Sequence, residues 1–266
     1  MINIKDFSLH NSAERTDISN DVLLPTFYQH QSVYSFCQKF IKNKYVVEIG
    51  CGTGYGTYKL SKFVKKIIAL DKDSGVIKNN KLKYNADNLE FICSNIEDYS
   101  NSKKADVVIS FQVIEHLKTP QLLLDKAKSM LNKNGMLILS TPNRLTQSYN
   151  ENPYHYKEYS SKELQKMLLK YFRKVEMYGL YGNLMVNKYE MERRKQVLSI
   201  LNKDKLRLRR LVPRSLRQII FDFFTVFNRN LMKTENNYLK ISEKNYKVLR
   251  KTKQAIDLIV VCQNIK

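Results

Sequence analysis

Glycines occupy every second position from residue 50 to residue 54, directly after a short apolar run. The run, Val-Val-Glu-Ile at residues 46–49, is too short and too β-branched for a helix, whereas residues 57–63 have helical character. Glycine permits positive φ angles and lets the backbone approach a ligand closely, and the next helix begins with unpaired N–H groups. A strand, a glycine turn and a helix in this order indicate a site for a nucleotide-type ligand.

An acidic residue ends the second apolar run of the chain. Residues 65–70 read Lys-Lys-Ile-Ile-Ala-Leu, and Asp71 follows them, with Asp73 two positions further on. In doubly wound folds a carboxylate about 20 residues past the glycine turn accepts hydrogen bonds from ribose hydroxyls. We assign this role to Asp71, because it ends the strand. Asp73 is better suited to capping the helix that follows.

Two histidines, His116 and His155, lie beyond the N-terminal region, and Glu115 precedes the first of them. A neutral imidazole accepts a proton from a hydroxyl near neutral pH, which suits general-base catalysis. We therefore take Glu115, His116 and His155 as the candidate catalytic residues. The structural alternatives are a loop hydrogen bond for His116 and a contact with Glu158 for His155.

Strands and helices alternate through the first 145 residues, which predicts parallel strands joined by right-handed crossovers. The predicted strands are 45–49, 65–70, 89–93, 105–111 and 136–140, and the predicted helices between them are 57–63, 73–84 and 120–131. In such a sheet the ligand lies at the carboxyl ends of the strands. Glu48, Asp71, Asn95, Gln112 and Asn143 all fall at those ends.

The flanking regions are predicted to be mainly helical. Pro25 is expected to break the chain, and a helix is expected over residues 27–40, within an N-terminal helical cap that spans residues 1–44. Ser160 and Glu163 have the spacing of a capping box at the start of a helix. Two further strands are predicted at 173–180 and 255–262. About 70 residues separate them, too many for a hairpin loop, so we predict a basic helical insert over 183–254 with helices at 186–202, 213–228 and 242–253.

The net charge is strongly positive and unevenly distributed. The 266 residues include 46 Lys and Arg against 25 Asp and Glu, and residues 188–253 hold 19 basic and 6 acidic residues, which is 13 of the 21 surplus charges. A positive field favours phosphate-bearing substrates, an anionic membrane surface or nucleic acid. A solvated basic face without a partner is the alternative.

The length and apolar content fit one elaborated globular domain over residues 1–266.

Cysteine spacing and hydropathy argue against a zinc site and a membrane span. The four cysteines are scattered, with no Cys-x-x-Cys motif. Residues 1–10 contain no apolar signal core, and the longest apolar stretch, 219–227, is interrupted by Asp222 and is too short to cross a bilayer. We expect a cytoplasmic protein, with peripheral contact to the inner face of the membrane as an alternative.

Several of these segments resemble the motifs of class I S-adenosylmethionine (SAM)-dependent methyltransferases. Residues 48–54 match their first motif, Asp71 their second, residues 105–110 their fourth and residues 135–143 the strand beyond. The match covers roughly residues 45–145, and 255–262 fits the final antiparallel strand. The resemblance implies an α/β, Rossmann-like, doubly wound sheet of seven strands that is mostly parallel with an antiparallel last strand, plus a helical insert before that strand.

The same resemblance implies a bound SAM. The glycines would pass under its methionine moiety, Glu48 would steady the turn and Asp71 would hold the ribose. Asn95 and Ile96 would flank the adenine. The full set of implied cofactor contacts is Glu48, Gly50, Cys51, Gly52, Gly54, Asp71, Lys72, Asn95, Ile96, Phe111 and Gln112, of which the last two would line the sulfonium end.

Two finer resemblances concern the methyl acceptor. Glu14-Arg15 before an aromatic helix, the basic stretch 208–214 and the ending 257–262 resemble bacterial methyltransferases of surface-glycan and lipid-linked sugar pathways. Residues 114–117 together with His155 resemble the ubiquinone-type O-methyltransferases and the small-RNA 2′-O-methyltransferases. The latter bind a divalent metal through two Glu and two His. Because Gln112 stands at the first Glu position, we expect no metal here.

The sequence therefore predicts SAM-dependent methyl transfer to a hydroxyl of a sugar, a glycolipid intermediate or another small acceptor. An RNA 2′-O-methyltransferase and a non-catalytic SAM-binding regulator are the alternatives. The expected partner is a small-molecule or lipid-linked sugar acceptor. The apolar stripe of the predicted helix 213–228 suits the domain's own core, a homodimer interface or an anionic membrane surface.

Overall fold

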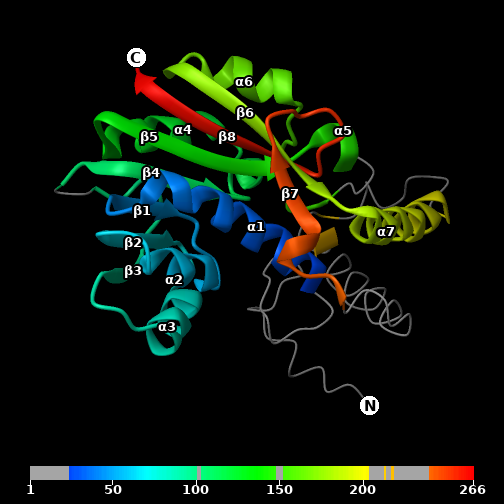
Figure 1. The fold of residues 1–266 in the computed structure, drawn as a ribbon, viewed down its shortest axis with the longest axis horizontal. Helices are drawn as coiled ribbons and strands as arrows, with labels where there is room; N and C mark the ends of the chain where they lie inside the picture. The colour runs from blue at the N-terminus through cyan, green and yellow to red at the C-terminus, as the bar shows by residue number, and fades with distance from the viewer. Residues whose placement is uncertain (1–23, 101–102, 148–151, 204–212, 214–216, 219–239) are drawn as a thin grey trace.

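The computed structural model of the chain describes residues 24–100, 103–147, 152–203, 213, 217–218 and 240–266 (Figure 1). Three features of the sequence lie outside this part of the chain. They are Glu14-Arg15, the basic stretch 208–214 apart from Pro213, and the predicted helix 213–228 apart from Pro213, Arg217 and Gln218. Within the described residues, no helix combines the length and the apolar character that crossing a bilayer requires.

A single eight-stranded sheet forms the centre of the fold, with strand order β3-β2-β1-β4-β5-β8-β6-β7. The first five strands in this order are parallel, whereas β8 is antiparallel to both of its neighbours and β7 is antiparallel to β6. The strands are β1 (Tyr45–Ile49), β2 (Lys66–Asp71), β3 (Leu89–Cys93), β4 (Ala105–Phe111), β5 (Leu131–Pro142), β6 (Phe172–Gly182), β7 (Tyr246–Leu249) and β8 (Asp257–Ile265). The predicted doubly wound, mostly parallel architecture is confirmed.

Helices cover both faces of this sheet (Figure 1). They are α1 (Leu24–Ile41), α2 (Tyr55–Ser61), α3 (Ser74–Lys83), α4 (Pro120–Met130), α5 (Arg144–Gln147), α6 (Ser161–Leu168) and α7 (Leu184–Lys203), with 3₁₀ turns η3 (Ile114–His116) and η7 (Glu243–Asn245). Asp73 caps α3 by accepting hydrogen bonds from the amides of Gly75 and Val76, and Ser160 with Glu163 forms a capping box on α6. Both caps were predicted from the sequence.

Neighbouring residues of the central strands enter different hydrophobic clusters. Val46 and Ile67 pack with α1, α2 and α7 on one face of the sheet, whereas Val47 and Ile68 pack with α4 and α6 on the other. Burial on both faces is typical of parallel sheets, and it explains why these strands appear in the sequence as continuous apolar runs. The sheet is thereby held rigid between two helical layers, with its carboxyl edge available for a site.

Two predictions about the elements were wrong. Residues 242–253 do not form a helix, because after the short turn η7 the chain enters β7, which pairs with β6 and adds an eighth strand to the predicted seven. The Tyr246 side chain is buried, and its hydroxyl donates to the carbonyl of Pro25, so long-range packing decides this conformation. Pro25 was expected to break the chain, but it lies in the first turn of α1, where proline is tolerated.

A buried carboxyl group at the start of β8 makes stability depend on pH. Asp257 is 1% exposed and accepts a hydrogen bond from the Gln29 side chain at 2.7 Å. Burial raises the pKa of Asp257 from its ordinary value of 3.8 to about 7, although the Gln29 contact opposes the shift. The folded protein therefore favours the neutral form of Asp257. The contribution of this neutral carboxyl to the free energy of unfolding is complete below the unfolded pKa and is lost as pH rises through about 7.

We expect the free energy of unfolding to fall between pH 4 and pH 7, with Asp257 contributing on the order of 4 kcal/mol to that fall. Asp257→Asn keeps an acceptor for Gln29 but removes the ionisation, so the variant should lose stability less steeply over this range. Urea unfolding at pH 4.5, 5.5 and 7.5 measures the difference. An identical dependence of the unfolding free energy on pH in the variant would show that folding does not raise the pKa of Asp257.

Candidate functional site

The glycine turn after β1 has the backbone conformation that its composition predicts. Gly50, Gly52 and Gly54 have φ angles of 76°, 52° and 72°, in the left-handed region. The amides of Gly50 and Cys51 donate to the carbonyl of Leu70, which ties the turn to the end of β2. A Cβ on Gly50 would lie 2.5 Å from a methyl group of Val113, whereas a Cβ on Gly52 would meet no atom within 4 Å. Gly52 therefore faces open space, as expected for the floor of a ligand site.

Asp71 lies beside this turn at the end of β2. One of its carboxylate oxygens accepts a hydrogen bond from the Gly52 amide and the other accepts one from the Asp73 amide, both at 3.0 Å. A carboxylate oxygen has room for more than one hydrogen bond, so these contacts leave Asp71 able to receive further donors. The residue predicted to hold a ribose thus also fixes the shape of the turn.

Glu48 lies beneath the turn and joins it to α1. It is fully buried and accepts hydrogen bonds from the hydroxyls of Tyr34, at 2.6 Å, and Thr57, at 2.5 Å. Burial raises the pKa of Glu48 to about 7, against the effect of these two contacts. The Tyr34 ring fills the space over Gly56, where a Cβ would lie 2.0 Å from its Cζ atom. Helix α1 is thereby fastened to the glycine turn.

A cavity of about 750 Å³ opens at the carboxyl ends of β1, β2 and β4. Nine of the eleven predicted cofactor contacts line it, namely Gly50, Cys51, Gly52, Asp71, Lys72, Asn95, Ile96, Phe111 and Gln112. The two others lie behind the cavity wall, since Glu48 is fully buried and Gly54 packs against Asn80.

Gln112 turns the chain sharply at the end of β4. Its φ angle of 55° is unusual for a residue with a side chain, and its amide donates to the carbonyl of Ser140 on β5. The 3₁₀ turn η3 follows at once. This bend places Glu115 and His116 at the carboxyl edge of the sheet, where strained backbone is often found near functional groups.

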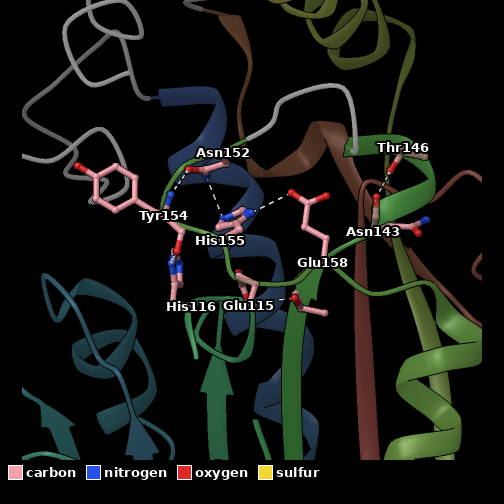
Figure 2. A network of polar contacts seen from close by, with 9 residues as sticks. Glu115, His116, Asn143, Thr146, Asn152, Tyr154, His155 and Glu158 are labelled. Atoms are coloured by element: carbon pink, nitrogen blue, oxygen red, sulfur yellow. Dashed lines mark hydrogen bonds and ion pairs between the residues drawn. The ribbon is translucent and has the colours of Figure 1, made fainter. Parts of the chain in front are cut away.

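The candidate catalytic residues lie on η3 and on residues 152–158, which we call the 152–158 segment (Figure 2). Glu115 is 1% exposed and accepts a hydrogen bond from the Thr141 hydroxyl at 2.9 Å. Burial raises the pKa of the Glu115 carboxyl. His116 is half-buried and lines the cavity.

His155 lies beside His116 but is not part of the cavity lining. The two imidazole rings are 4.9 Å apart, edge to face, and His155 contacts the Glu158 carboxylate at 2.8 Å. That contact is the structural alternative predicted for His155. The structure therefore brings the three candidates together but gives only His116 direct access to the cavity.

Sequence reasoning missed part of the cavity wall. The missed residues that carry aromatic or imidazole rings are His30, Tyr34, Tyr55, Tyr154 and Tyr156. Three of them come from α1 and the start of α2. The aromatic character of α1 was recognised in the sequence, but not that this helix faces the cavity. The two others flank His155, and no local pattern shows that the 152–158 segment returns to η3.

Glu115, His116 and His155 also form a possible metal-binding group among the described residues, with ligand atoms within 4.8 Å of one another. Most of these atoms are already engaged. One Glu115 oxygen accepts from Thr141, both nitrogens of His155 contact Asn152 and Glu158, and Nδ1 of His116 contacts the Tyr154 carbonyl. A divalent ion needs several ligands at once, so binding would require these contacts to break.

We therefore expect Mg²⁺, Mn²⁺ and Zn²⁺ to leave the thermal midpoint unchanged, and a chelator to leave methyl transfer unchanged. Differential scanning fluorimetry with and without each ion measures the first, and a transfer assay with EDTA measures the second. A clear rise in midpoint with Mn²⁺ or Zn²⁺ that disappears in His116→Ala would establish a metal site and contradict this expectation.

A protein-family model described as a methyltransferase domain matches residues 41–197 of the chain. This match includes β1 to β6 and the whole cavity edge of the sheet. The chain belongs to this methyltransferase-domain family.

Two curated relatives illustrate the range of the similarity. A probable SAM-dependent methyltransferase of Mycobacterium tuberculosis, Rv3030, is 32% identical over 176 residues, which are 64% of this chain and 64% of that protein. The ubiquinone biosynthesis O-methyltransferase of Bradyrhizobium diazoefficiens is 28% identical over 124 residues, 42% of this chain and 49% of that protein. The chain thus spans less than two thirds of the length of these relatives.

Among solved structures, a SAM-dependent methyltransferase from Thermotoga maritima superposes with a TM-score of 0.60 over 91% of this chain and 92% of that chain. The sequence identity is 14%, so the likeness is one of fold. It covers nearly the whole of both chains.

Proposed function

We propose that the protein is an enzyme that binds SAM in the cavity and methylates a hydroxyl group of a small acceptor. The observation that carries the proposal is that one cavity is lined both by the glycine turn with Asp71 and by His116. The expected cofactor contacts and a group able to accept a proton thus line the same cavity. Membership of the methyltransferase-domain family and the SAM-dependent relatives support the same reading.

The residues of the turn fit a cofactor of this kind. Gly52 leaves open space where any other residue would place a Cβ, and its positive φ angle suits glycine. Asp71 lies at the cavity wall with capacity for the ribose hydroxyls, and Asn95 and Ile96 line the part expected to receive the adenine. When bound, SAM supplies a methyl group on a positively charged sulfonium, which needs no further activation.

The chain's own contribution is to orient the acceptor and to receive a proton. His116 contacts the carbonyl of Tyr154 through Nδ1 at 3.2 Å. A carbonyl oxygen only accepts hydrogen bonds, so Nδ1 carries the hydrogen and Nε2 of the neutral ring carries a lone pair. Nε2 is then the atom that takes the hydroxyl proton of the acceptor, which makes its oxygen a better nucleophile.

The cavity lining favours a sugar or a related hydroxylated ring as acceptor. Tyr154, Tyr156, Tyr55 and His30 provide ring surfaces in the same cavity as the proposed base, and such surfaces stack on the apolar faces of ring-shaped ligands. Relatives of two kinds are named O-methyltransferases, those of ubiquinone biosynthesis and those of malonyl-[acyl-carrier protein], which supports oxygen as the methylated atom. A glycolipid form of the acceptor would account for the surplus of positive charge through its phosphate.

Trapping the methyl acceptor tests this proposal. The purified protein and SAM with a labelled methyl group are incubated with lipid, small-molecule and RNA fractions of a cell extract. We expect protein-dependent label in the lipid or small-molecule fraction. Ribonuclease-sensitive label would favour RNA methylation instead. Tight SAM binding with no label in any fraction would favour a non-catalytic regulator.

A further inference from the structure

The 152–158 segment is fixed to the turn that carries His116. The amides of Tyr156 and Lys157 both donate to the carbonyl of Glu115, at 2.7 and 3.3 Å. Two donors on one carbonyl hold the segment against η3 at one point. Figure 2 shows the His155 ring beside the His116 ring, with the Tyr154 ring pointing away from both of them. Segment and turn therefore behave as one unit, although they are nearly 40 residues apart in the chain.

The hydrogen bonds of His155 define which of its nitrogens carries the hydrogen. Nδ1 lies 2.8 Å from a Glu158 carboxylate oxygen, which only accepts, so Nδ1 is the donor. Nε2 lies 3.0 Å from the amide nitrogen of Asn152, which donates to it. The other end of the Asn152 amide accepts from the Tyr154 amide at 3.0 Å, which fixes its orientation. Each of these three contacts thus pairs a donor with an acceptor.

These contacts set the position of the Tyr154 carbonyl. Asn152 holds the Tyr154 amide, and His155, anchored by Glu158, is the next residue along the chain. The Tyr154 carbonyl between them accepts from Nδ1 of His116, and the His155 ring packs edge to face on the His116 ring. The Glu158 and His155 side chains are only 12% and 11% exposed, so water competes weakly for their contact.

We propose that Asn152, His155 and Glu158 are positioning residues that hold the Tyr154 carbonyl on His116 and so select the imidazole form with its lone pair on Nε2. The proposal rests on the proposed function in one respect, namely that His116 is the proton acceptor. It gives His155 a supporting role, because its Nε2 would have to leave Asn152 before it could accept a proton.

The test is a long-range ¹H–¹⁵N correlation spectrum of the full chain with ¹⁵N-labelled histidine, which reports the protonated nitrogen of each ring. In the native protein we expect both His116 and His155 in the form with hydrogen on Nδ1. In Glu158→Ala and Asn152→Ala, His116 should shift towards the form with hydrogen on Nε2. Glu158→Gln keeps an acceptor oxygen and should retain the native pattern.

Transfer kinetics provide a second measurement. Glu158→Ala should lower kcat about ten-fold with an unchanged KM for SAM, and Glu158→Gln should restore most of the loss. The matched control is Glu90→Ala, which removes a carboxylate from the exposed ion pair with Lys66 on the opposite part of the sheet. It should change neither the spectrum nor kcat.

The outcomes separate this proposal from the proposed function. Hydrogen on Nε2 of His116 in the native protein would overturn the positioning role, whether or not methyl transfer occurs. The expected histidine spectra without any methyl transfer would leave the positioning role standing and overturn the proposed function. A native-like His116 signal in both folded alanine variants would overturn the positioning role as well. Because the native spectrum can by itself overturn the positioning role, the proposal stays testable where a variant fails to fold.

Discussion

Gly52→Arg should abolish SAM binding, with a loss of affinity of at least about 100-fold, or roughly 2.7 kcal/mol. Residue 52 lines the cavity, and a Cβ there meets no atom within 4 Å, so the arginine side chain would extend into the cavity. There it would occupy the volume that the cofactor needs, and its positive charge would repel the sulfonium. Isothermal titration calorimetry with SAM and with S-adenosylhomocysteine measures the change.

Two glycine-to-alanine variants serve as controls for this substitution. Gly52→Ala adds a Cβ that meets nothing within 4 Å, so it should weaken binding less than about ten-fold, mainly through the strain of the positive φ angle. Gly50→Ala would place its Cβ 2.5 Å from Val113, so it should lower the free energy of unfolding by about 1–3 kcal/mol. Unchanged SAM affinity in a folded Gly52→Arg protein would place the cofactor elsewhere.

His116→Gln should lower kcat by about 100- to 10,000-fold, the range expected when a general base is removed. Glutamine keeps hydrogen-bonding groups of similar size but cannot accept a proton near neutral pH. Affinity for SAM should stay within about two-fold, since His116 is assigned to the acceptor and not to the cofactor. Transfer kinetics and calorimetry on the same preparation separate the two effects.

The matched control is His30→Gln, which changes the other histidine of the cavity wall. His30 lies on α1, 3.2 Å from the Tyr55 hydroxyl. We expect it to raise the KM for the acceptor and to change kcat less than ten-fold. Equal losses of kcat in both variants would remove the case for His116 as the base.

The fold was largely predictable because its signals are local. Buried parallel strands give continuous apolar runs, and the caps at Asp73 and Ser160 mark the starts of α3 and α6. The strand β7 was missed because four residues on the edge of a sheet have no sequence pattern of their own. Its pairing with β6 and the anchoring of Tyr246 on α1 are decided by residues that are distant in sequence.

The cofactor side of the site could be predicted better than the acceptor side. One βαβ unit contains Gly50, Gly52 and Asp71, and its fixed geometry brings the glycine turn next to the end of the following strand. Their separation along the chain is therefore enough to predict that they lie close together. Tyr34 and Tyr154 reach the same cavity from an N-terminal helix and a loop. Nothing in their local sequence shows that α1 crosses over the glycine turn or that Asn152 orients the loop.

The most direct test of the whole account is the chemical nature of the bond that the protein forms. SAM carrying a ¹³C-labelled methyl group is incubated with the protein and the trapped acceptor, and the product is examined by ¹³C NMR, which distinguishes methyl groups on oxygen, nitrogen and carbon. The account predicts a single methyl ether on a hydroxyl oxygen, formed by the native protein and by neither Gly52→Arg nor His116→Gln at a comparable rate. A methyl group on nitrogen or carbon, or full activity in His116→Gln, would contradict it.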